Sequence, residues 1–410
     1  MEKTVFNIIV GIIVFNYILD RVLSYLNIKN MKQDLPKEAV DIYDREKYRK
    51  SQEYHYETAR FSMITSTFSV ILILSMLFLE GFAYVDKLAR SVTEQPVLIA
   101  LIFFGILAIA SDILSIPFDL YDTFVIEEKY GFNKTTPKIY IMDKIKDYAL
   151  GIVIGGGGLA LLAWIYYSVG FYFWIYAWIV LGIFILLTTM FYASVILPLF
   201  NKLTPLPEGE LRTAIEEYCK KVDFKLDNLF VMDGSKRSSK ANAFFSGFGP
   251  RKKIVLFDTL IEKHSKEELI AVLAHEVGHY KRKHTAQGII ISLLQSGFML
   301  FILSFFINSP ELAGALGVPQ PSFHIGILAF TLLYSPLALI FSIFMNIVSR
   351  KNEYEADEFA KETYNAASLI AALKKLSADN LSNLTPHPAY VFFHYSHPPL
   401  LKRLDALAIG

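Results

Sequence analysis

Cysteine is almost absent from this chain of 410 residues, since Cys219 is the only one. A single cysteine excludes an internal disulfide framework and a metal site built from several thiolates. The chain also lacks an excess of charge, because 40 Lys and Arg face 39 Asp and Glu for a formal net charge of +1. Nucleic acids are bound largely through positive charge, so we expect no nucleic-acid partner.

Hydrophobic residues, in contrast, make up 53% of the chain and gather in long runs. A helix needs about 20 mainly apolar residues to cross the ~30 Å of hydrocarbon in a bilayer. We therefore predict an all-α polytopic membrane protein whose seven transmembrane helices contact lipid. The first run lacks a cleavage pattern, so we expect it to remain as a span. The predicted spans are 4–28, 62–85, 97–116, 149–168, 171–199, 285–307 and 325–347.

Four consecutive glycines, Gly155–Gly158, lie in the fourth predicted span. Two interpretations stay open. Small residues allow two membrane helices to approach closely. Glycine also destabilises a helix, so the same run could be a locally loosened segment.

Lys and Arg are distributed unevenly between the loops. Segment 29–61 contains eight of them, whereas segment 308–324 contains none. Positive residues favour the cytoplasmic side of a membrane, so we predict an outside N-terminus and a cytoplasmic C-terminus. The chain then divides into five spans with their loops, a soluble region, two further spans and a soluble C-terminal region. These four parts are 1–199, 200–284, 285–347 and 348–410.

A candidate metal site lies in the soluble region, where residues 266–284 read KEELIAVLAHEVGHYKRKH. Apolar residues at helical spacing, preceded by Ser265, predict a helix. On it His275 and His279 lie one turn apart on the same face and can bind one Zn²⁺. Glu276 beside them can accept a proton from activated water, as in H-E-x-x-H proteases. The alternative is a helix with two exposed histidines and no metal.

A catalytic zinc usually has three protein ligands and one open position. His284 is a weak candidate for the third ligand, because the spacing from His279 differs from that of known three-histidine motifs. Glu353 and Asp357 stand one turn apart on a predicted helix after the seventh span. One of them could bind the metal while the other orients a ligand histidine. Spacing does not decide between them.

Six blocks of the sequence, in this order, resemble those of the integral-membrane CAAX prenyl endopeptidases. These are zinc proteases of the gluzincin type that act on isoprenylated C-terminal motifs. The resemblance covers most of the chain. The blocks are LPKEAVDIYDREKYRKSQEYHYETARFS (35–62), PFDLYDTFVIEEKYGFNKTTP (117–137), SKRSSKANAFFSGFG (235–249), LAHEVGHYKRKHT (273–285), SRKNEYEADEFA (349–360) and HYSHPPLLKRLDAL (394–407).

The resemblance implies seven helices around a large water-filled chamber within the membrane, with one zinc ion at its cytoplasmic end. It implies that Glu353 is the third zinc ligand and that Asp357 supports a ligand histidine. Region 200–284 would then carry the protease helix and region 348–410 the third ligand.

The resemblance also implies substrate-binding residues. Asn242 and Ala243 would align a peptide, and His397 and Arg403 would donate hydrogen bonds to it or to a developing oxyanion. Without the resemblance, we would interpret His397 as a turn residue before Pro398. We would interpret Arg403 as an exposed cation on a helix.

The expected activity is zinc-dependent hydrolysis of a peptide or lipidated peptide near its C-terminus. Two alternatives are a general quality-control metalloprotease of the membrane and a transporter or channel with a structural metal. An intramembrane acidic residue such as Asp112 would favour the transporter class. Eukaryotic members of the family that the chain resembles often end with a lysine pair for retrieval to the endoplasmic reticulum, whereas this chain ends in LDALAIG. We therefore expect a bacterial inner membrane rather than the endoplasmic reticulum.

Overall fold

The computed structural model describes residues 1–410 except 33, 36–39, 226–228, 248–252 and 410. Lys37 and parts of two blocks quoted above, 36–39 and 248–249, lie outside the described residues. As predicted, most of the described chain is helical. The helices of the first half are α1 (Glu2–Asn30), α2 (Arg45–Phe78), α3 (Gly81–Val92), α4 (Pro96–Tyr121), α5 (Pro137–Leu150), α6 (Gly157–Val169), α7 (Phe173–Phe191) and α8 (Leu197–Phe200).

The second half combines helices with a small sheet that the sequence analysis did not predict. Its helices are α9 (Glu210–Lys221), α10 (Asp258–Lys263), α11 (Lys266–Lys281), α12 (His284–Phe306), α13 (Pro310–Ala315), α14 (Phe323–Thr363), α15 (Ala366–Asp379), α16 (Pro388–His394) and α17 (Leu400–Ala408). Its strands are β1 (Leu203–Pro205), β2 (Leu229–Met232), β3 (Ala243–Ser246) and β4 (Lys253–Phe257). Within the described residues the strand order is β1-β2-β4-β3, which leaves β3 at one edge.

Six helical segments among the described residues are long and apolar enough to cross a membrane. One of them, Pro137–Phe200, is 64 residues long and contains two of the predicted spans. At about 1.5 Å per residue, a straight helix of this length would far exceed the bilayer. Instead the chain reverses at Gly170, whose φ is 60°, and α6 packs against α7. The count of seven spans stays a prediction.

Two details of the predicted spans differ in the structure. The second, 62–85, is interrupted, because α2 ends at Phe78 and α3 begins at Gly81 after Glu80 in a left-handed conformation. The four glycines straddle a helix boundary, since Gly155 and Gly156 end a π-helix that spans Gly151–Gly156, and Gly157 and Gly158 begin α6. In the described part of the chain, no side chain lies within 4 Å of a Cβ placed at Gly155, Gly157 or Gly158. Close helix approach is therefore the wrong interpretation.

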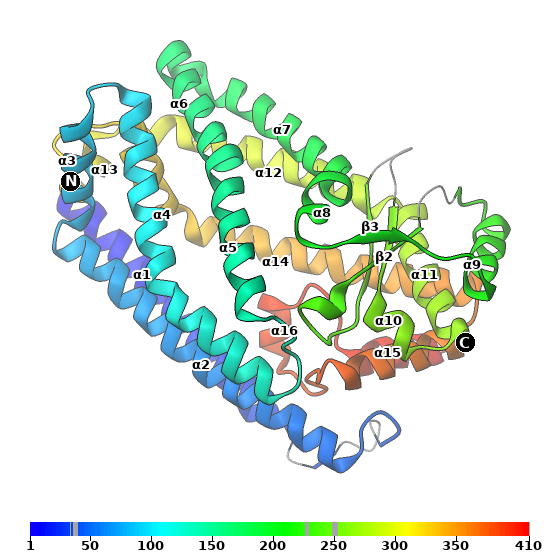
Figure 1. Ribbon diagram of the computed structural model, residues 1–410. Helices are drawn as coiled ribbons and strands as arrows, with labels where there is room; N and C mark the ends of the chain where they lie inside the picture. Colours follow the sequence, from blue (N-terminus) through cyan, green and yellow to red (C-terminus); the bar gives the residue numbers. More distant parts are fainter. Residues whose placement is uncertain (33, 36–39, 226–228, 248–252, 410) are drawn as a thin grey trace.

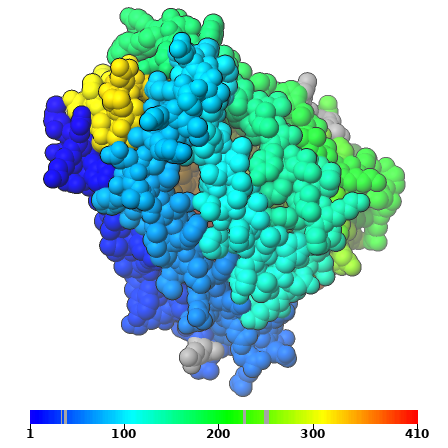
Figure 2. Space-filling model, turned by 60° about the vertical axis from the view of Figure 1, so that its left-hand side comes forward, coloured from blue at the N-terminus to red at the C-terminus, as the bar shows by residue number. Residues whose placement is uncertain are grey.

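The membrane helices enclose an interior space. Helix α1 contacts α2 and α14, and α2 reaches α4 through α3. Helix α4 contacts α6, α6 contacts α7, α7 contacts α12, and α12 contacts α14, which closes a ring. In the most apolar stretch of α1, only 6% of the residues are buried inside the protein, and the share for α2 is the same. Helices packed into a solid bundle would bury far more of their surface. Figure 2 shows an opening between the blue and cyan N-terminal helices, through which more distant orange-brown atoms are seen.

Asp112 has an ion-pair partner on α5. Its carboxylate lies 2.7 Å from Nζ of Lys144 on α5, and Tyr148 also donates a hydrogen bond to it. Lys144 contacts Asp119 at 3.2 Å as well. The acidic residue that would have favoured a transporter is thus one half of an ion pair between α4 and α5.

Candidate metal centre

Helix α11 carries the two histidines and begins where the sequence predicts. Ser265 caps it, with the Glu268 backbone donating to the serine side chain and the Glu268 carboxylate accepting from the Ser265 backbone. This capping box satisfies amide groups that the first turn would otherwise leave unpaired. Most of the helix is buried between the sheet, α14 and α15. It therefore forms a rigid base for its side chains.

Helix α14 approaches α11 closely at one glycine. A Cβ placed at Gly278 would lie 3.1 Å from the Cα and the carbonyl oxygen of Ala356. A larger residue at either position would push the helices apart. This contact brings Glu353, one turn before Ala356, beside the histidines of α11. The glycine of HEVGH thus has a packing function that is separate from metal binding.

The structure brings His275, His279 and Glu353 together, and one ligand atom from each lies within 4.8 Å of the others. The Nε2 atoms of the two histidines are 3.1 Å apart. The Glu353 oxygens lie 3.5 Å from Nε2 of His275 and 3.3 Å from Nε2 of His279. Ligand atoms about 2.0–2.1 Å from a tetrahedral zinc are roughly 3.3 Å from one another.

One oxygen of Glu353 supports a cation at this point. Glu353 is 5% exposed, and among the described residues its Oε2 atom has no hydrogen-bond donor. The cationic groups nearest to this buried oxygen are Nη1 of Arg403 at 3.4 Å and Nε2 of His275 at 3.5 Å, and a bound metal ion would add to the compensation that a buried carboxylate needs. Two imidazole nitrogens and a carboxylate are also a donor set that zinc prefers. The residues present therefore fit the metal that the sequence predicts.

His275 is held from its other side by Asp357. Its Nδ1 atom lies 2.9 Å from Oδ1 of Asp357, so Nε2 is left to face Glu353 and His279. Burial alone would lower the pKa of His275, but the contacts with Asp357 and Glu353 raise it to about 9. The metal-free ring is therefore protonated on both nitrogens near neutral pH. Once a metal replaces the proton on Nε2, the acceptor on Nδ1 holds the remaining proton there and orients the ring.

Arg403 binds Asp357 and also approaches Glu353. Its Nε and Nη2 atoms donate to the two oxygens of Asp357 at 2.7 and 2.6 Å. Nη1 lies 3.4 Å from Glu353. Arg403 is 9% exposed, so the cation predicted to be surface-exposed in the absence of the resemblance is buried. This bidentate geometry makes Arg403 a partner of Asp357, and its contact with substrate stays a prediction.

We expect Arg403→Ala to destabilise the protein. Asp357 is 2% exposed, and removal of Arg403 takes away two of its hydrogen bonds and leaves His275 to compensate a buried charge. Such a loss typically costs about 3–5 kcal/mol. Thermal unfolding in detergent should show a clearly lower midpoint, whereas exposed Lys402→Ala on the same helix should leave it unchanged. An unchanged midpoint for Arg403→Ala would argue against a structural ion pair.

Glu276 lies on the other side of the histidines, toward the sheet. Its Oε2 accepts a hydrogen bond of 3.2 Å from the backbone N–H of Phe245 on β3. Burial raises the pKa of Glu276 above its usual value. A carboxylate with a raised pKa is a stronger base, which suits a group that must accept and return a proton.

The edge strand β3 lies beside Glu276. Ala243 is its first residue, and Asn242 precedes it and is exposed. The side chain of Asn242 accepts from the Ala243 backbone at 2.9 Å. Because β3 pairs with β4 on one side only, its second edge can receive another extended chain. The Phe245 backbone on this edge is a contact that the sequence analysis missed, since pairing on a sheet is non-local.

His397 approaches Glu353 from the C-terminal region. Its Nε2 atom lies 3.3 Å from Oε1 of Glu353, and its Nδ1 atom lies 3.0 Å from the hydroxyl of Ser396. The His397 side chain is 65% exposed. Of the two predicted substrate donors, it is the one that a bound molecule can reach directly.

His284 lies on the far side of His279. Its Nδ1 atom is 3.0 Å from Nδ1 of His279, not from the Nε2 atoms that converge with Glu353. His284 is therefore outside the three-residue group. A cavity of about 310 Å³ adjoins it and is also lined by Glu276, His279 and Phe245.

Comparison with known proteins identifies the family. The family model described as "CAAX prenyl protease N-terminal, five membrane helices" matches residues 24–202. The model of peptidase family M48 matches residues 205–409. The chain belongs to peptidase family M48. An M48 member with these membrane helices is a multi-pass membrane metalloendopeptidase, as the sequence predicted.

Several named relatives match over nearly their whole length. A CAAX prenyl protease 1 homolog of Arabidopsis thaliana is 36% identical over 97% of this chain and 96% of its own. CAAX prenyl protease 1 of Saccharomyces cerevisiae is 34% identical over 98% and 94%. The crystal structure of S. mikatae Ste24p superposes with a TM-score of 0.94 at 33% identity, covering 98% of this chain and 99% of that one. This coverage favours the CAAX-type reading over the shorter quality-control proteases.

Proposed function

We propose that this M48 peptidase is a zinc endopeptidase that hydrolyses peptides near the C-terminus of isoprenylated substrates. The observation that carries the proposal is the convergence of His275, His279 and Glu353, with Glu276 beside them. The names of the relatives, CAAX prenyl proteases, supply the substrate class.

His275, His279 and Glu353 would hold the metal through two Nε2 atoms and a carboxylate. When bound, zinc supplies a Lewis acid that activates water and polarises the scissile carbonyl. Glu276 accepts the proton of the attacking water and returns it to the leaving amine. Asp357, held by Arg403, keeps Nδ1 of His275 protonated, so that the nitrogen facing the metal stays a ligand.

The substrate peptide would bind as an extra strand along β3. Asn242 and Ala243 lie at the start of this edge, and Glu276 lies opposite its third residue. Backbone hydrogen bonds would then provide most of the affinity, which gives loose sequence specificity. His397 would donate to the carbonyl oxygen as negative charge develops there, because its side chain is exposed beside Glu353.

An apolar tail on the substrate would suit the surroundings of this site. The 310 Å³ cavity beside Glu276 and His279 is also lined by Ile291, Met345 and Val348 of the membrane helices α12 and α14. Burial of an isoprenoid chain gains roughly 0.8 kcal/mol per CH₂ equivalent. We propose that the lipid increases binding rather than the rate of the chemical step.

We further propose that the metal end of the molecule faces the cytoplasm, with the N-terminus on the opposite side. The support is the excess of Lys and Arg in the segments beside it. The bacterial inner membrane was our expectation, but the relatives named above are eukaryotic and lend it no support.

The test compares a farnesylated peptide with its unprenylated counterpart. Purified enzyme should cleave the farnesylated peptide with a lower KM and a similar kcat. A chelator should stop both reactions, and added zinc should restore them. Fragment masses identify the bond that is cut. Equal kcat/KM values for the two peptides would count against a lipid-binding role, and cleavage that resists complete metal removal would count against the zinc assignment.

A further inference from the structure

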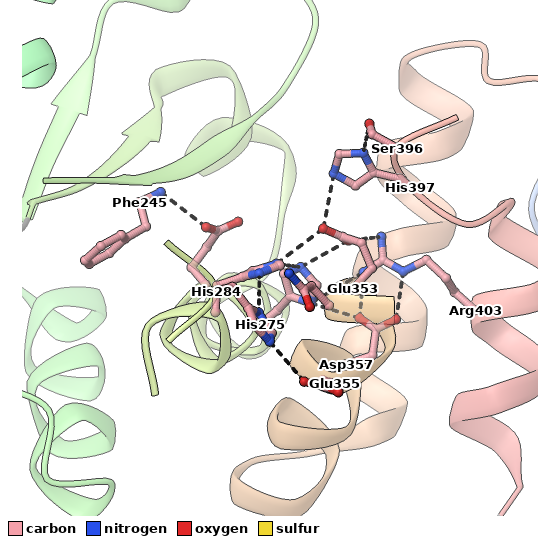
Figure 3. A network of polar contacts seen from close by, with 12 residues as sticks. Phe245, His275, His284, Glu353, Glu355, Asp357, Ser396, His397 and Arg403 are labelled. Carbon is pink, nitrogen blue, oxygen red and sulfur yellow. Dashed lines mark hydrogen bonds and ion pairs between the residues drawn. The ribbon is translucent and has the colours of Figure 1, made fainter. Parts of the chain in front are cut away.

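The second metal-site histidine also has a partner behind it. Nδ1 of His279 lies 3.0 Å from Nδ1 of His284, and Nε2 of His284 lies 3.1 Å from Oε2 of Glu355. Figure 3 shows His284 and Glu355 on the side of the cluster away from Glu353. His284 is 8% exposed, whereas the Glu355 side chain is 36% exposed. A chain of polar contacts therefore runs from the metal site outward to a carboxylate.

The nitrogen that carries each proton in this series of contacts follows from the state of its outermost group, Glu355. An ionised Glu355 can only accept, so Nε2 of His284 must carry the hydrogen of their contact. A neutral His284 then has a lone pair on Nδ1. Nδ1 of His279 must in turn be the donor in the contact between the two rings. His279 is left with a lone pair on Nε2, which is the atom that faces His275 and Glu353.

A parallel arrangement supports His275. There the acceptor on Nδ1 is Asp357, which Arg403 holds with two hydrogen bonds. Both histidines thus present Nε2 to the metal position and Nδ1 to a partner that accepts a proton. An acceptor on the far nitrogen of a ligand histidine fixes its tautomer and ring orientation and raises its basicity.

We propose that His284 and Glu355 position His279 as a metal ligand. This inference deepens the proposed zinc function and rests on it. His284 is not itself a ligand, because its contact reaches the Nδ1 side of the His279 ring. Lys351 lies 3.7 Å from the other oxygen of Glu355 and helps to keep that carboxylate ionised. His284 begins α12 and Glu355 lies on α14, so the pair also links these two membrane helices.

The experiment measures metal affinity and catalysis in His284→Leu, His284→Asn and Glu355→Ala. Zinc affinity is obtained by competition with a chromophoric chelator, and the cobalt-substituted enzyme gives an absorption spectrum of the ligand field. We expect His284→Leu to lower zinc affinity about 10- to 100-fold and to alter the cobalt spectrum. With saturating zinc and the unprenylated peptide, kcat should fall and KM should change little, since His284 is proposed to act on the metal ligand and this peptide has no lipid to fill the cavity that His284 adjoins.

His284→Asn provides the rescue. The Oδ1 atom of asparagine can occupy the place of Nδ1 and accept from His279, so affinity and spectrum should return most of the way to wild type. Glu355→Ala should lower zinc affinity as His284→Leu does, but by a smaller factor. Glu358→Ala is the matched control, because Glu358 is exposed on the same helix, and it should behave as wild type.

Three results would overturn the inference. The first is wild-type zinc affinity and cobalt spectrum in His284→Leu. The second is an asparagine variant as impaired as the leucine variant, which would indicate a packing role. The third is two zinc ions per chain, which would make His284 a ligand. If His284→Leu does not fold, Glu355→Ala and His284→Asn still decide. Failure of the wild-type enzyme to bind zinc or cleave peptide would instead reject the proposed function.

Discussion

Glu276→Gln abolishes peptide hydrolysis while the protein keeps its zinc: this is the expected result with the largest effect on catalysis. Glutamine has the shape of glutamate and can still accept the hydrogen bond from Phe245. It has no basic oxygen with which to remove a proton from water. General acid–base catalysis contributes about 10²–10⁴-fold, so kcat should fall by at least this range. Zinc content and KM should stay near wild type.

The measurement pairs metal analysis with steady-state kinetics on the farnesylated peptide. Glu267→Gln is the matched control, since it makes the same change at an exposed position of the same helix. It should retain full activity. Wild-type turnover in Glu276→Gln would remove Glu276 from the role of base, and loss of zinc in this variant would indicate that Glu276 is a ligand instead.

Glu353→Gln, unlike Glu276→Gln, should lower the affinity of the protein for zinc. Glu353 is the only negative group of the three-residue cluster, and its oxygens lie between the two histidines. The amide removes the negative charge and one of the two carboxylate oxygens. Zinc affinity should therefore fall by more than the roughly 10–100-fold expected for loss of a partner behind a ligand. Hydrolysis should disappear with the metal.

Competition with a chelator measures this change, and Glu358→Gln on the same helix serves as the control. Excess zinc should restore part of the activity of Glu353→Gln but none of that of Glu276→Gln. This difference separates a ligand from a base. A Glu353→Gln enzyme that binds zinc as tightly as wild type would mean that another group completes the site.

Local features of the fold and site follow from short-range sequence patterns. The helix with HEVGH begins at the residue that its capping box predicts, because Ser265 and Glu268 are three residues apart. His275 and His279 share a face for the same kind of reason, since they are one helical turn apart. The apolar runs likewise predict membrane helices from length and composition alone.

Non-local features were predicted poorly. The four strands are three to five residues long, and their alternation is too short to distinguish from loop. The second span was placed too long because the left-handed turn at Glu80 sits inside an apolar run. Residue spacing did not choose between Glu353 and Asp357, and the prediction that Arg403 contacts substrate did not anticipate its bidentate contact with Asp357.

By itself, then, the sequence determined the class of protein, the helix with its histidine pair and the group able to act as base. Each of these depends on neighbours within a few residues or on bulk composition. The tertiary structure alone decided how Glu353 meets the histidines after the chain has passed through α12 and the membrane part of α14, and which nitrogen of each ring faces the metal position. The physical reason is packing: α11 and α14 approach closely at Gly278 and Ala356, and that contact places Glu353 beside His275 and His279.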